Sequence, residues 1–434
     1  MRFYSTNNPE HKVDLSEAVV RGLAPDNGLY MPERIPVLPS SFFNSIEKLS
    51  FKEISLAVAR NILGTSIPED ELNRMVDHTI QFDAPVIGIE DDIFALELFH
   101  GPTLAFKDFG ARFMSQLLGY FARQQHQQIV ILVATSGDTG SAVANGFLGV
   151  AGTRVVVLYP SGKVSEIQEK QFTTLGENIT AIEIDGTFDD CQRLVKESFL
   201  DADLRKKHFL TSANSINIAR LIPQSFYYFH AYAQVKHRNK PVVFCVPSGN
   251  FGNITGGLFA NRMGLPVHRF IAATNSNDVV PEYLRTHVFK PRASEQTISN
   301  AMDVGNPSNI VRMLDLFKGN VEAMAAEIES YAFSDAQTKE AMIKVYTKKG
   351  YMLDPHGAVG YLGLTRYMER SSGSLTGVFL ETAHPAKFKE TVEEILETQV
   401  DIPPALQKFM LREKTTIKAG SDFGDFKAYL LNRF

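Results

Sequence analysis

Residues 128–140 read QIVILVATSGDTG, and this stretch decides the fold class. Residues 128–134 form an apolar, β-branched run that stops at the turn TSGDTG, and a helical pattern of small residues follows from Ser141. A short, continuous apolar run of this kind is typical of a strand in a parallel sheet that is covered on both faces. The stretch therefore predicts a strand–loop–helix unit of an α/β domain.

The same rhythm continues downstream. Further strands are expected at residues 154–159, 179–184, 241–246, 269–274 and 377–380, with helices at about 164–175, 190–199 and 254–263. We therefore expect an α/β fold with two α/β domains, each built on an open, twisted, mostly parallel sheet. In such folds ligands bind at the carboxyl ends of the strands, so the loops that follow the strands are the candidate sites.

The N-terminal part of the chain has a different pattern. Residues 1–95 hold mixed helical patterns and turn clusters such as PDNG, without the strand–loop–helix rhythm. We expect a separate N-terminal domain at 1–95, a small α/β domain at 128–211, and a large domain made of 96–127 and 212–434. A length of 434 residues fits two to three domains.

The composition indicates a globular, soluble protein. Hydrophobic residues make up 44% and charged residues 21%, and the net charge of −5 gives no basic footprint for nucleic acid. The N-terminus has no apolar signal-peptide core, and the apolar runs are too short to span a bilayer. The two cysteines, Cys191 and Cys245, cannot form a disulfide framework and fit a reducing compartment. We expect a cytoplasmic protein.

Lys107 is the first residue that could carry chemistry. It stands in HGPTLAFKD at 100–108, between Phe106 and Phe109. Aromatic neighbours can desolvate the lysine, which lowers the pKa of its amine and makes it a usable nucleophile or base. The local pattern alone favours an exposed helix lysine.

Two strand-end loops could hold anions. SGNFGN at 248–253 leads from a strand into a helix, so its backbone amides could form a phosphate cradle, although an ordinary glycine-rich turn has the same pattern. TSGDTG at 135–140 could hold a second anion such as a substrate carboxylate, or it could simply cap the helix through Ser136 or Asp138. A fixed Asp138 beside an anion is unfavourable unless its carboxylate faces elsewhere.

The segment SANSINIAR at 212–220 offers a guanidinium. Arg220 could make paired hydrogen bonds to a phosphate, and the alternative is a capping box with a surface salt bridge. His384 is expected to be a structural histidine, and the eleven histidines show no metal-binding spacing, so we expect no metal site. We find neither a serine-hydrolase elbow nor a Walker loop.

Together these motifs resemble the threonine synthase family of fold-type-II pyridoxal-phosphate (PLP) enzymes, over nearly the whole chain. The resemblance extends to GLAPDNGLYMP at 22–32 and GVFLETAHPAKF at 377–388. It implies that Lys107 holds PLP as a Schiff base, that Thr382 meets the pyridine nitrogen, and that Asp138 stands where many relatives have an asparagine facing the 3′ oxygen. It assigns the PLP phosphate to Ser248, Gly249, Asn250, Phe251, Gly252 and Asn253, and the substrate to Thr135, Ser136, Thr139, Asn214, Ser215 and Arg220.

The resemblance also implies a reaction. A PLP-dependent carbon–oxygen lyase of this family converts O-phospho-L-homoserine and water to L-threonine and phosphate, the last step of threonine biosynthesis. Lys107 would move protons at Cα, Cβ and Cγ, and no nucleic acid, membrane or obligate protein partner is expected. The first alternative is a related phospho-lyase that releases a ketoacid. The second is a catalytically silent binding protein, against which the intact Lys107 and phosphate loop argue.

Overall fold

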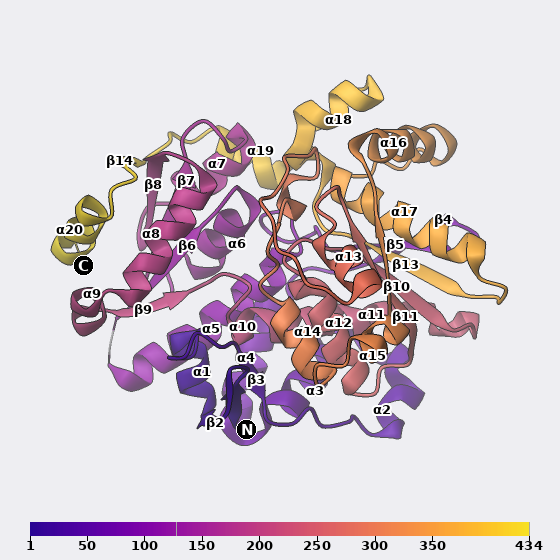
Figure 1. Ribbon diagram of the computed structural model, residues 1–434, viewed down its shortest axis with the longest axis horizontal. Coiled ribbons are helices and arrows are strands. Elements are labelled where there is room, and N and C mark those ends of the chain that lie inside the picture. Colours follow the sequence, from indigo (N-terminus) through magenta and orange to yellow (C-terminus); the bar gives the residue numbers. More distant parts are fainter. Residues whose placement is uncertain (127, 434) are drawn as a thin grey trace.

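The computed structural model describes residues 1–126 and 128–433, whose strands form three sheets (Figure 1). The small parallel sheet has the order β14-β8-β7-β6-β9. Its strands are β6 (Ile129–Ala134), β7 (Thr153–Pro160), β8 (Ile179–Asp185), β9 (Phe209–Ser212) and β14 (Ile417–Gly420). The quoted apolar run is therefore an inner strand of this sheet, as its composition predicts.

The large sheet has the order β12-β11-β10-β13-β5-β4. Its strands are β4 (Val86–Glu90), β5 (Ile93–Glu97), β10 (Val242–Pro247), β11 (Val267–Thr274), β12 (Ile328–Ala332) and β13 (Thr376–Glu381). Only β4, at one edge, runs antiparallel to its neighbour; the other described pairs in this sheet are parallel. The predicted α/β fold with mostly parallel sheets is confirmed.

Both faces of the inner strands are buried, which explains their continuous apolar sequences. In β6, Ile129 and Ile131 belong to the main core, whereas Val130 and Leu132 pack in a second core with Leu194 of α8 (Phe188–Leu200). In β10, Phe244 belongs to the main core, whereas Cys245 belongs to a separate core beneath α17 (Pro355–Arg370). Alternate side chains point to opposite faces of a sheet, so a strand with helices on both sides needs apolar residues at every position.

The N-terminal region packs against the rest through its helices. A small antiparallel sheet joins β1 (Phe3–Ser5) to β2 (Asn8–Val13) and β3 (Tyr30–Pro32). The helices here are α1 (Leu15–Arg21), α2 (Ser40–Ser45), α3 (Phe51–Leu63) and α4 (Glu69–Thr79). Helix α3 begins with a capping box of Ser50 and Glu53, and it contacts α11 (Phe226–Val235), while α4 contacts α5 (Lys107–Gln125).

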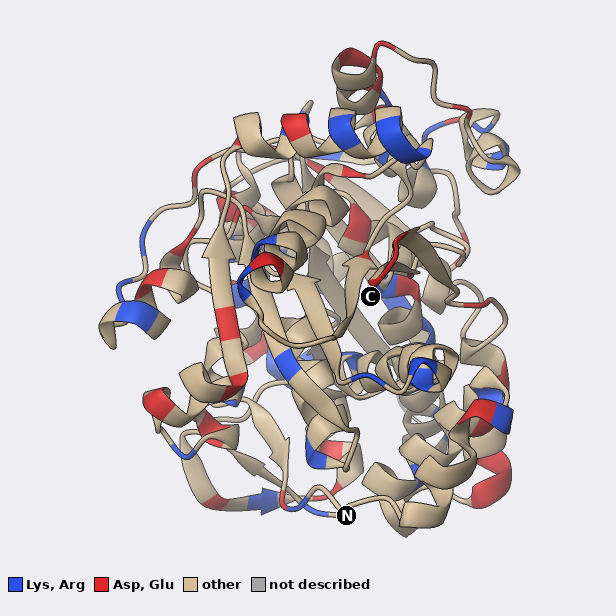
Figure 2. Cartoon of the chain, turned by 90° about the vertical axis from the view of Figure 1, so that its right-hand side faces the viewer, with Lys and Arg blue, Asp and Glu red and all other residues tan. Residues whose placement is uncertain are grey.

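The remaining helices surround the two parallel sheets (Figure 1). They are α6 (Asp138–Phe147), α7 (Glu166–Thr173), α9 (Ala202–Lys207), α10 (Ile218–Leu221), α12 (Gly252–Arg262), α13 (Val279–Thr286), α14 (Ile310–Leu316), α15 (Val321–Glu327), α16 (Asp335–Lys349), α18 (Lys389–Leu396), α19 (Pro404–Met410) and α20 (Phe423–Arg433). In the part of the chain that the structure describes, no helix is long and apolar enough to cross a bilayer. Basic and acidic residues are interspersed along the outer helices and loops (Figure 2).

Strand pairing moves two of the expected domain boundaries. The boundary at residue 95 falls inside β5, which pairs with β13, so β4 and β5 belong to the large sheet and not to the N-terminal region. The segment 212–434 is not wholly part of the large domain either, because β14 pairs with β8 of the small sheet. Both differences concern strands that join their sheet across a long sequence separation. Residues 127 and 434, which the expected boundaries include, lie outside the described residues.

Candidate active site

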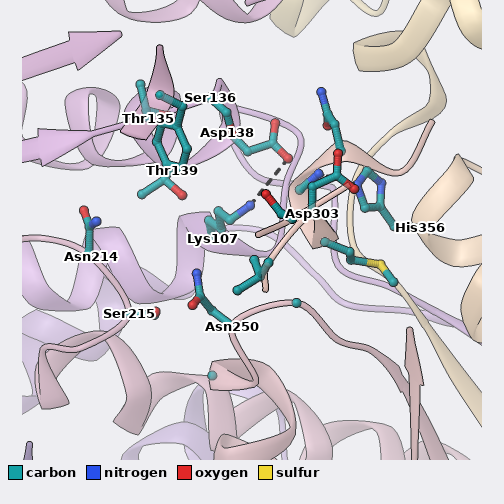
Figure 3. Close-up of a pocket in the computed structure, with 18 of the residues that line it drawn as sticks. Lys107, Thr135, Ser136, Asp138, Thr139, Asn214, Ser215, Asn250, Asp303 and His356 are labelled. Carbon is teal, nitrogen blue, oxygen red and sulfur yellow. Dashed lines mark hydrogen bonds and ion pairs between the residues drawn. The ribbon is translucent and has the colours of Figure 1, made fainter. Parts of the chain in front are cut away.

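A cavity of about 390 Å³ lies where the loops after β6, β9, β10 and β13 converge (Figure 3). All the residues that the sequence analysis assigned to cofactor or substrate line it: Lys107, Thr135, Ser136, Asp138, Thr139, Asn214, Ser215, Arg220, Ser248, Gly249, Asn250, Phe251, Gly252, Asn253 and Thr382. Two of these strands belong to the small sheet and two to the large sheet. The carboxyl ends of parallel strands from both sheets therefore build one site.

Lys107 is the first residue of α5, and the end of β13 holds it in place. The N–H of Phe106 donates to the carbonyl of Thr382 at 2.9 Å, and Ala105 forms a bridge to Ala383. The Lys107 side chain is only 17% exposed, and its Nζ lies 5.3 Å from the centroid of the Phe106 ring. It is therefore not an exposed helix lysine, and burial lowers the pKa of its amine although Asp138 opposes the shift.

The TSGDTG turn is shaped by its own first residue. The Oγ1 of Thr135 accepts hydrogen bonds from the amides of Gly137 (2.9 Å) and Gly140 (2.8 Å). Gly137 has a φ of +142°, and a Cβ there would lie 2.5 Å from the side chain of Gln168, so the turn requires glycine. Thr135 thus fixes the loop, while Ser136 and Thr139 line the cavity (Figure 3).

Asp138 faces cations, and one of them, Lys387, is a residue that the sequence analysis missed. The fully buried Lys387 places its Nζ 2.6 Å from Oδ1 of Asp138, and Lys107 Nζ lies 3.7 Å from Oδ2. Gln168 also donates to Oδ1, at 2.9 Å. Burial opposes ionisation, yet the two lysines hold the pKa of the Asp138 carboxyl well below its usual range. The sequence feature that could have revealed Lys387 is its position in the otherwise largely apolar segment TAHPAKF.

The glycine-rich loop after β10 has donors ready for an anion. Phe251 takes a left-handed conformation with φ +60°, and α12 begins at Gly252, which directs the first helical amides toward the loop. Asn253 accepts hydrogen bonds on Oδ1 from Tyr227 (2.7 Å) and Tyr228 (2.8 Å). Its buried Nδ2 has no hydrogen-bond partner among the described residues. An unpaired buried donor beside a helix start fits a phosphate group.

The guanidinium of Arg220 offers a second set of donors. Asn217 caps the short helix α10, as the capping alternative allows, but Arg220 is buried and forms no salt bridge with any other described residue. Its Nη1 donates to the carbonyl of Ala213 at 2.5 Å, and within residues 1–126 and 128–433 its Nε has no partner. Burial lowers the pKa of this guanidinium to about 10, with Asp108 opposing. A buried cation with a free donor is suited to a second anion.

The opposite wall contains two further residues that the sequence analysis did not select, His356 and Asp303 (Figure 3). His356 contacts Asp354 through Nδ1 at 2.6 Å, and its Nε2 accepts from the amide of Ala301 at 3.2 Å. Asp303 accepts hydrogen bonds from both the amide and the hydroxyl of Thr297, at 3.0 and 2.7 Å. These contacts fix the loop that closes this side of the cavity.

His384 is structural, as expected. Its Nδ1 accepts from the amide of Ala386 at 3.1 Å, and its ring packs edge-on against Phe99 at 5.2 Å between centroids.

Among the described residues, no three His, Cys, Asp or Glu side chains are grouped so that they could hold a metal ion.

Three protein families match successive parts of the chain, and the second and third matches overlap. The family described as threonine synthase N terminus matches residues 2–80, that of pyridoxal-phosphate dependent enzymes matches residues 81–381, and the threonine synthase C-terminal family matches residues 357–430. The order of these matches follows the order of the N-terminal, central and C-terminal parts of the fold.

Curated proteins and solved structures agree with these matches. The threonine synthase of Haemophilus influenzae is 46% identical over 99% of this chain and 100% of that protein, and that of Escherichia coli K12 is 43% identical over 100% of both. The crystal structure of Escherichia coli threonine synthase superposes with a TM-score of 0.92, at 42% identity and 100% coverage of both chains. PLP-bound threonine synthase from Brucella melitensis gives 0.94 at 33% identity, covering 100% of this chain and 99% of that one. The chain therefore belongs to the threonine synthase family of pyridoxal-phosphate-dependent enzymes.

Proposed function

We propose that this chain is a PLP-dependent carbon–oxygen lyase that converts O-phospho-L-homoserine and water to L-threonine and phosphate. One observation carries the proposal: a single cavity joins the buried amine of Lys107 to two separate groups of unpaired anion donors, one at Asn253 and one at Arg220. A cofactor phosphate and a substrate phosphate require two such groups. Membership of the threonine synthase family supports the same assignment.

The residues of the first group fit the cofactor. The amides of residues 249–253 and the free Nδ2 of Asn253 would hold the PLP phosphate, while Lys107 carries the cofactor and the buried Thr382 meets the ring nitrogen. A hydroxyl at this position, in place of a carboxylate, would leave the ring nitrogen largely unprotonated. When bound, PLP supplies an electron sink for charge that develops at the substrate's α-carbon.

The residues of the second group fit the substrate. Arg220 would bind the substrate phosphate with Ser215 and Thr139 and stabilise the charge that grows on it as it leaves. Thr135, Ser136 and Asn214 lie on the same side of the cavity in Figure 3 and would hold the rest of the substrate, including its carboxylate. Burial lowers the pKa of Lys107 and so favours the neutral amine, which would take and return protons at Cα, Cβ and Cγ.

The proposal also covers the cellular location and the domain organisation of the enzyme. We place it in the cytoplasm, since Cys191 and Cys245 are both free and buried, as suits a reducing compartment. The N-terminal, small and large units would act as three domains, with β4 and β5 assigned to the large unit and β14 to the small one. No protein partner is required by this scheme.

The test follows the products of O-phosphohomoserine. The holoenzyme should release L-threonine and inorganic phosphate in equal amounts, whereas a ketoacid with phosphate would establish the phospho-lyase alternative. Absence of any turnover by a yellow, PLP-loaded protein would contradict both readings and leave a binding protein.

Lys107→Ala should abolish turnover, because no other cavity-lining lysine stands at the junction of α5 and β13 in the described structure. Borohydride reduction of the holoenzyme followed by peptide mapping should place the PLP label on Lys107. Lys163→Ala, at another cavity-lining lysine, is the matched control and should keep its label on Lys107. A label on any other lysine would overturn the assignment.

A further inference from the structure

Asp138 lies between two lysines from different parts of the chain. Lys387 belongs to the 3₁₀ helix η6 (Pro385–Phe388) that follows β13, and its Nζ sits 2.6 Å from Oδ1 of Asp138. The other carboxylate oxygen, Oδ2, is 3.7 Å from Nζ of Lys107, which is beyond a direct hydrogen bond (Figure 3). The carboxylate is thus bound tightly on one side and loosely on the side of the proposed catalytic amine.

Lys387 is itself fixed in place. Its side chain is fully buried, and its Nζ also donates to the carbonyl of Thr103 at 2.8 Å, across 284 residues of sequence. The amide and hydroxyl of Thr103 in turn donate to Asp108 at 2.9 and 2.6 Å. Lys387 therefore connects η6 to both the helix that begins at Asp138 and the loop that precedes Lys107. A buried lysine held by two acceptors cannot move without leaving a buried charge unpaired.

Charged groups from three other elements face the amine. Lys107 faces Asp138 from α6, Lys387 from η6 and Arg220 from α10, while Asp108 of α5 and His384 face Lys387. Among these described groups, Asp138 opposes the loss of a proton from Lys107, whereas both Lys387 and Arg220 favour that loss. Burial favours that loss most, and the strength of the pairing between Asp138 and Lys107 sets how far this effect is opposed.

We propose that Lys387 is a positioning residue for the reaction: by holding Asp138 through Oδ1, it keeps this carboxylate from forming a close ion pair with Lys107. The inference rests on the proposed function, in which Lys107 exchanges protons with the substrate. Without Lys387, the buried Asp138 would have Lys107 as its remaining nearby lysine. A close carboxylate–ammonium pair stabilises the charged amine and would slow proton exchange near neutral pH.

Lys387→Met in the holoenzyme tests this proposal, with Lys389→Met as the matched control because Lys389 pairs with Glu393 outside the cavity. The readout is the pH midpoint of the visible absorbance change of bound PLP, which reports protonation at Nζ of Lys107. We expect Lys387→Met to raise this midpoint by about one unit or more, the usual effect of an opposite charge within a few ångströms. The acid limb of kcat/KM should move in the same direction, with a loss of about tenfold per unit at the pH of the limb.

A double variant separates positioning from packing. Lys387→Met with Asp138→Asn removes both charges, so it should return the absorbance midpoint to within about half a unit of the wild-type value, which is the level of a lost weak interaction. Lys387→Gln, whose side chain is shorter than lysine and carries no charge, should also raise the midpoint and serves if the methionine variant does not fold. The midpoint could instead stay at the wild-type value in Lys387→Met or Lys387→Gln, with PLP still on Lys107. That result would overturn the positioning role of Lys387 and leave the proposed function intact. A PLP label on another lysine would instead overturn the proposed function.

Discussion

Arg220 is a buried guanidinium with part of its donor set unused. We expect Arg220→Lys to lower kcat/KM for O-phosphohomoserine although it keeps the charge, because it loses the planar fork that can bind a phosphate through paired hydrogen bonds. A lost charged hydrogen bond is worth about 1.5–3 kcal/mol, which corresponds to about one to two decades in rate. Arg220→Ala should lose more, and the PLP content of both variants should stay at the wild-type level.

The control for Arg220 is Arg193→Lys, at an exposed arginine on α8 that pairs with Glu197 and Asp190. It should leave both PLP content and kcat/KM unchanged. If instead PLP content falls in Arg220→Lys while kcat/KM per loaded enzyme holds, Arg220 serves the cofactor phosphate and the assignment of the two donor groups must be exchanged.

His384 makes the stability of the fold depend on pH. Burial lowers the pKa of His384 to about 4, against an opposing effect of Glu97, and its Nδ1 must stay unprotonated to accept from Ala386. The unfolded chain, with a histidine pKa of about 6.5, binds the proton more readily between pH 6.5 and pH 4, so the free energy of unfolding falls as pH decreases through this window. This histidine should account for about 2 kcal/mol of the loss between pH 7 and pH 5.

His384→Asn provides the comparison, because asparagine can accept the same hydrogen bond without titrating in this range. Urea unfolding midpoints at pH 7 and pH 5 should differ less for the variant than for the wild type. Equal losses in the two proteins would show that other groups cause the acid sensitivity.

At the scale of the elements, the loop between β10 and α12 has no space for a larger residue at Gly249. A Cβ there would lie 2.8 Å from Cα of Met302 and 3.0 Å from the carbonyl oxygen of Ala301, both backbone atoms. Overpacking of this kind typically costs about 1–3 kcal/mol. We expect Gly249→Ala to shift the loop and weaken PLP binding by about one to two decades, measured as the Kd for PLP added to the apoenzyme.

Gly373→Ala is the matched control, because a Cβ at Gly373 meets open space and the residue lies outside the cavity. Its Kd for PLP should equal that of the wild type. An unchanged Kd in a folded Gly249→Ala would argue against the loop as the PLP-phosphate site.

At the scale of the whole molecule, Arg312 connects the N-terminal sheet to both anion loops. Its guanidinium is fully buried and donates to the carbonyls of Tyr30 at the start of β3 (3.2 Å) and Ser215 (3.2 Å), and to Oδ1 of Asn309 (2.8 Å). Asn309 in turn donates to the carbonyl of Asn250 at 3.2 Å. Burial lowers the pKa of Arg312 to about 9, with Asp315 opposing. Its removal would leave several buried acceptors unpaired.

Arg312→Met should therefore lower stability by about 2–4 kcal/mol, the value of one or two charged hydrogen bonds, and weaken the binding of PLP and of inorganic phosphate together. Thermal midpoints and Kd values for the two anions measure these effects. Lys318→Met, just beyond α14, changes a lysine that no described ion pair involves and should alter neither quantity. A loss of stability with both Kd values intact would limit Arg312 to a packing role.

Local patterns were sufficient for the inner strands and for most of the cavity. The run at β6 is apolar at every position because helices cover both faces of its sheet, and the loops after β6, β9, β10 and β13 carry the donors that line the cavity. A strand, a turn and the start of a helix are set by neighbouring residues, so they can be read from the sequence by itself.

Only the tertiary structure decided which distant residues meet. It assigned β5 and β14 to sheets formed mainly by other parts of the chain, and it showed that Asp138, which looked unfavourable beside an anion, is neutralised by Lys387. A buried charge requires a partner, but its own neighbours in sequence do not identify that partner. The pairing is set by how η6 and α6 pack at the ends of two different sheets, which no local pattern encodes.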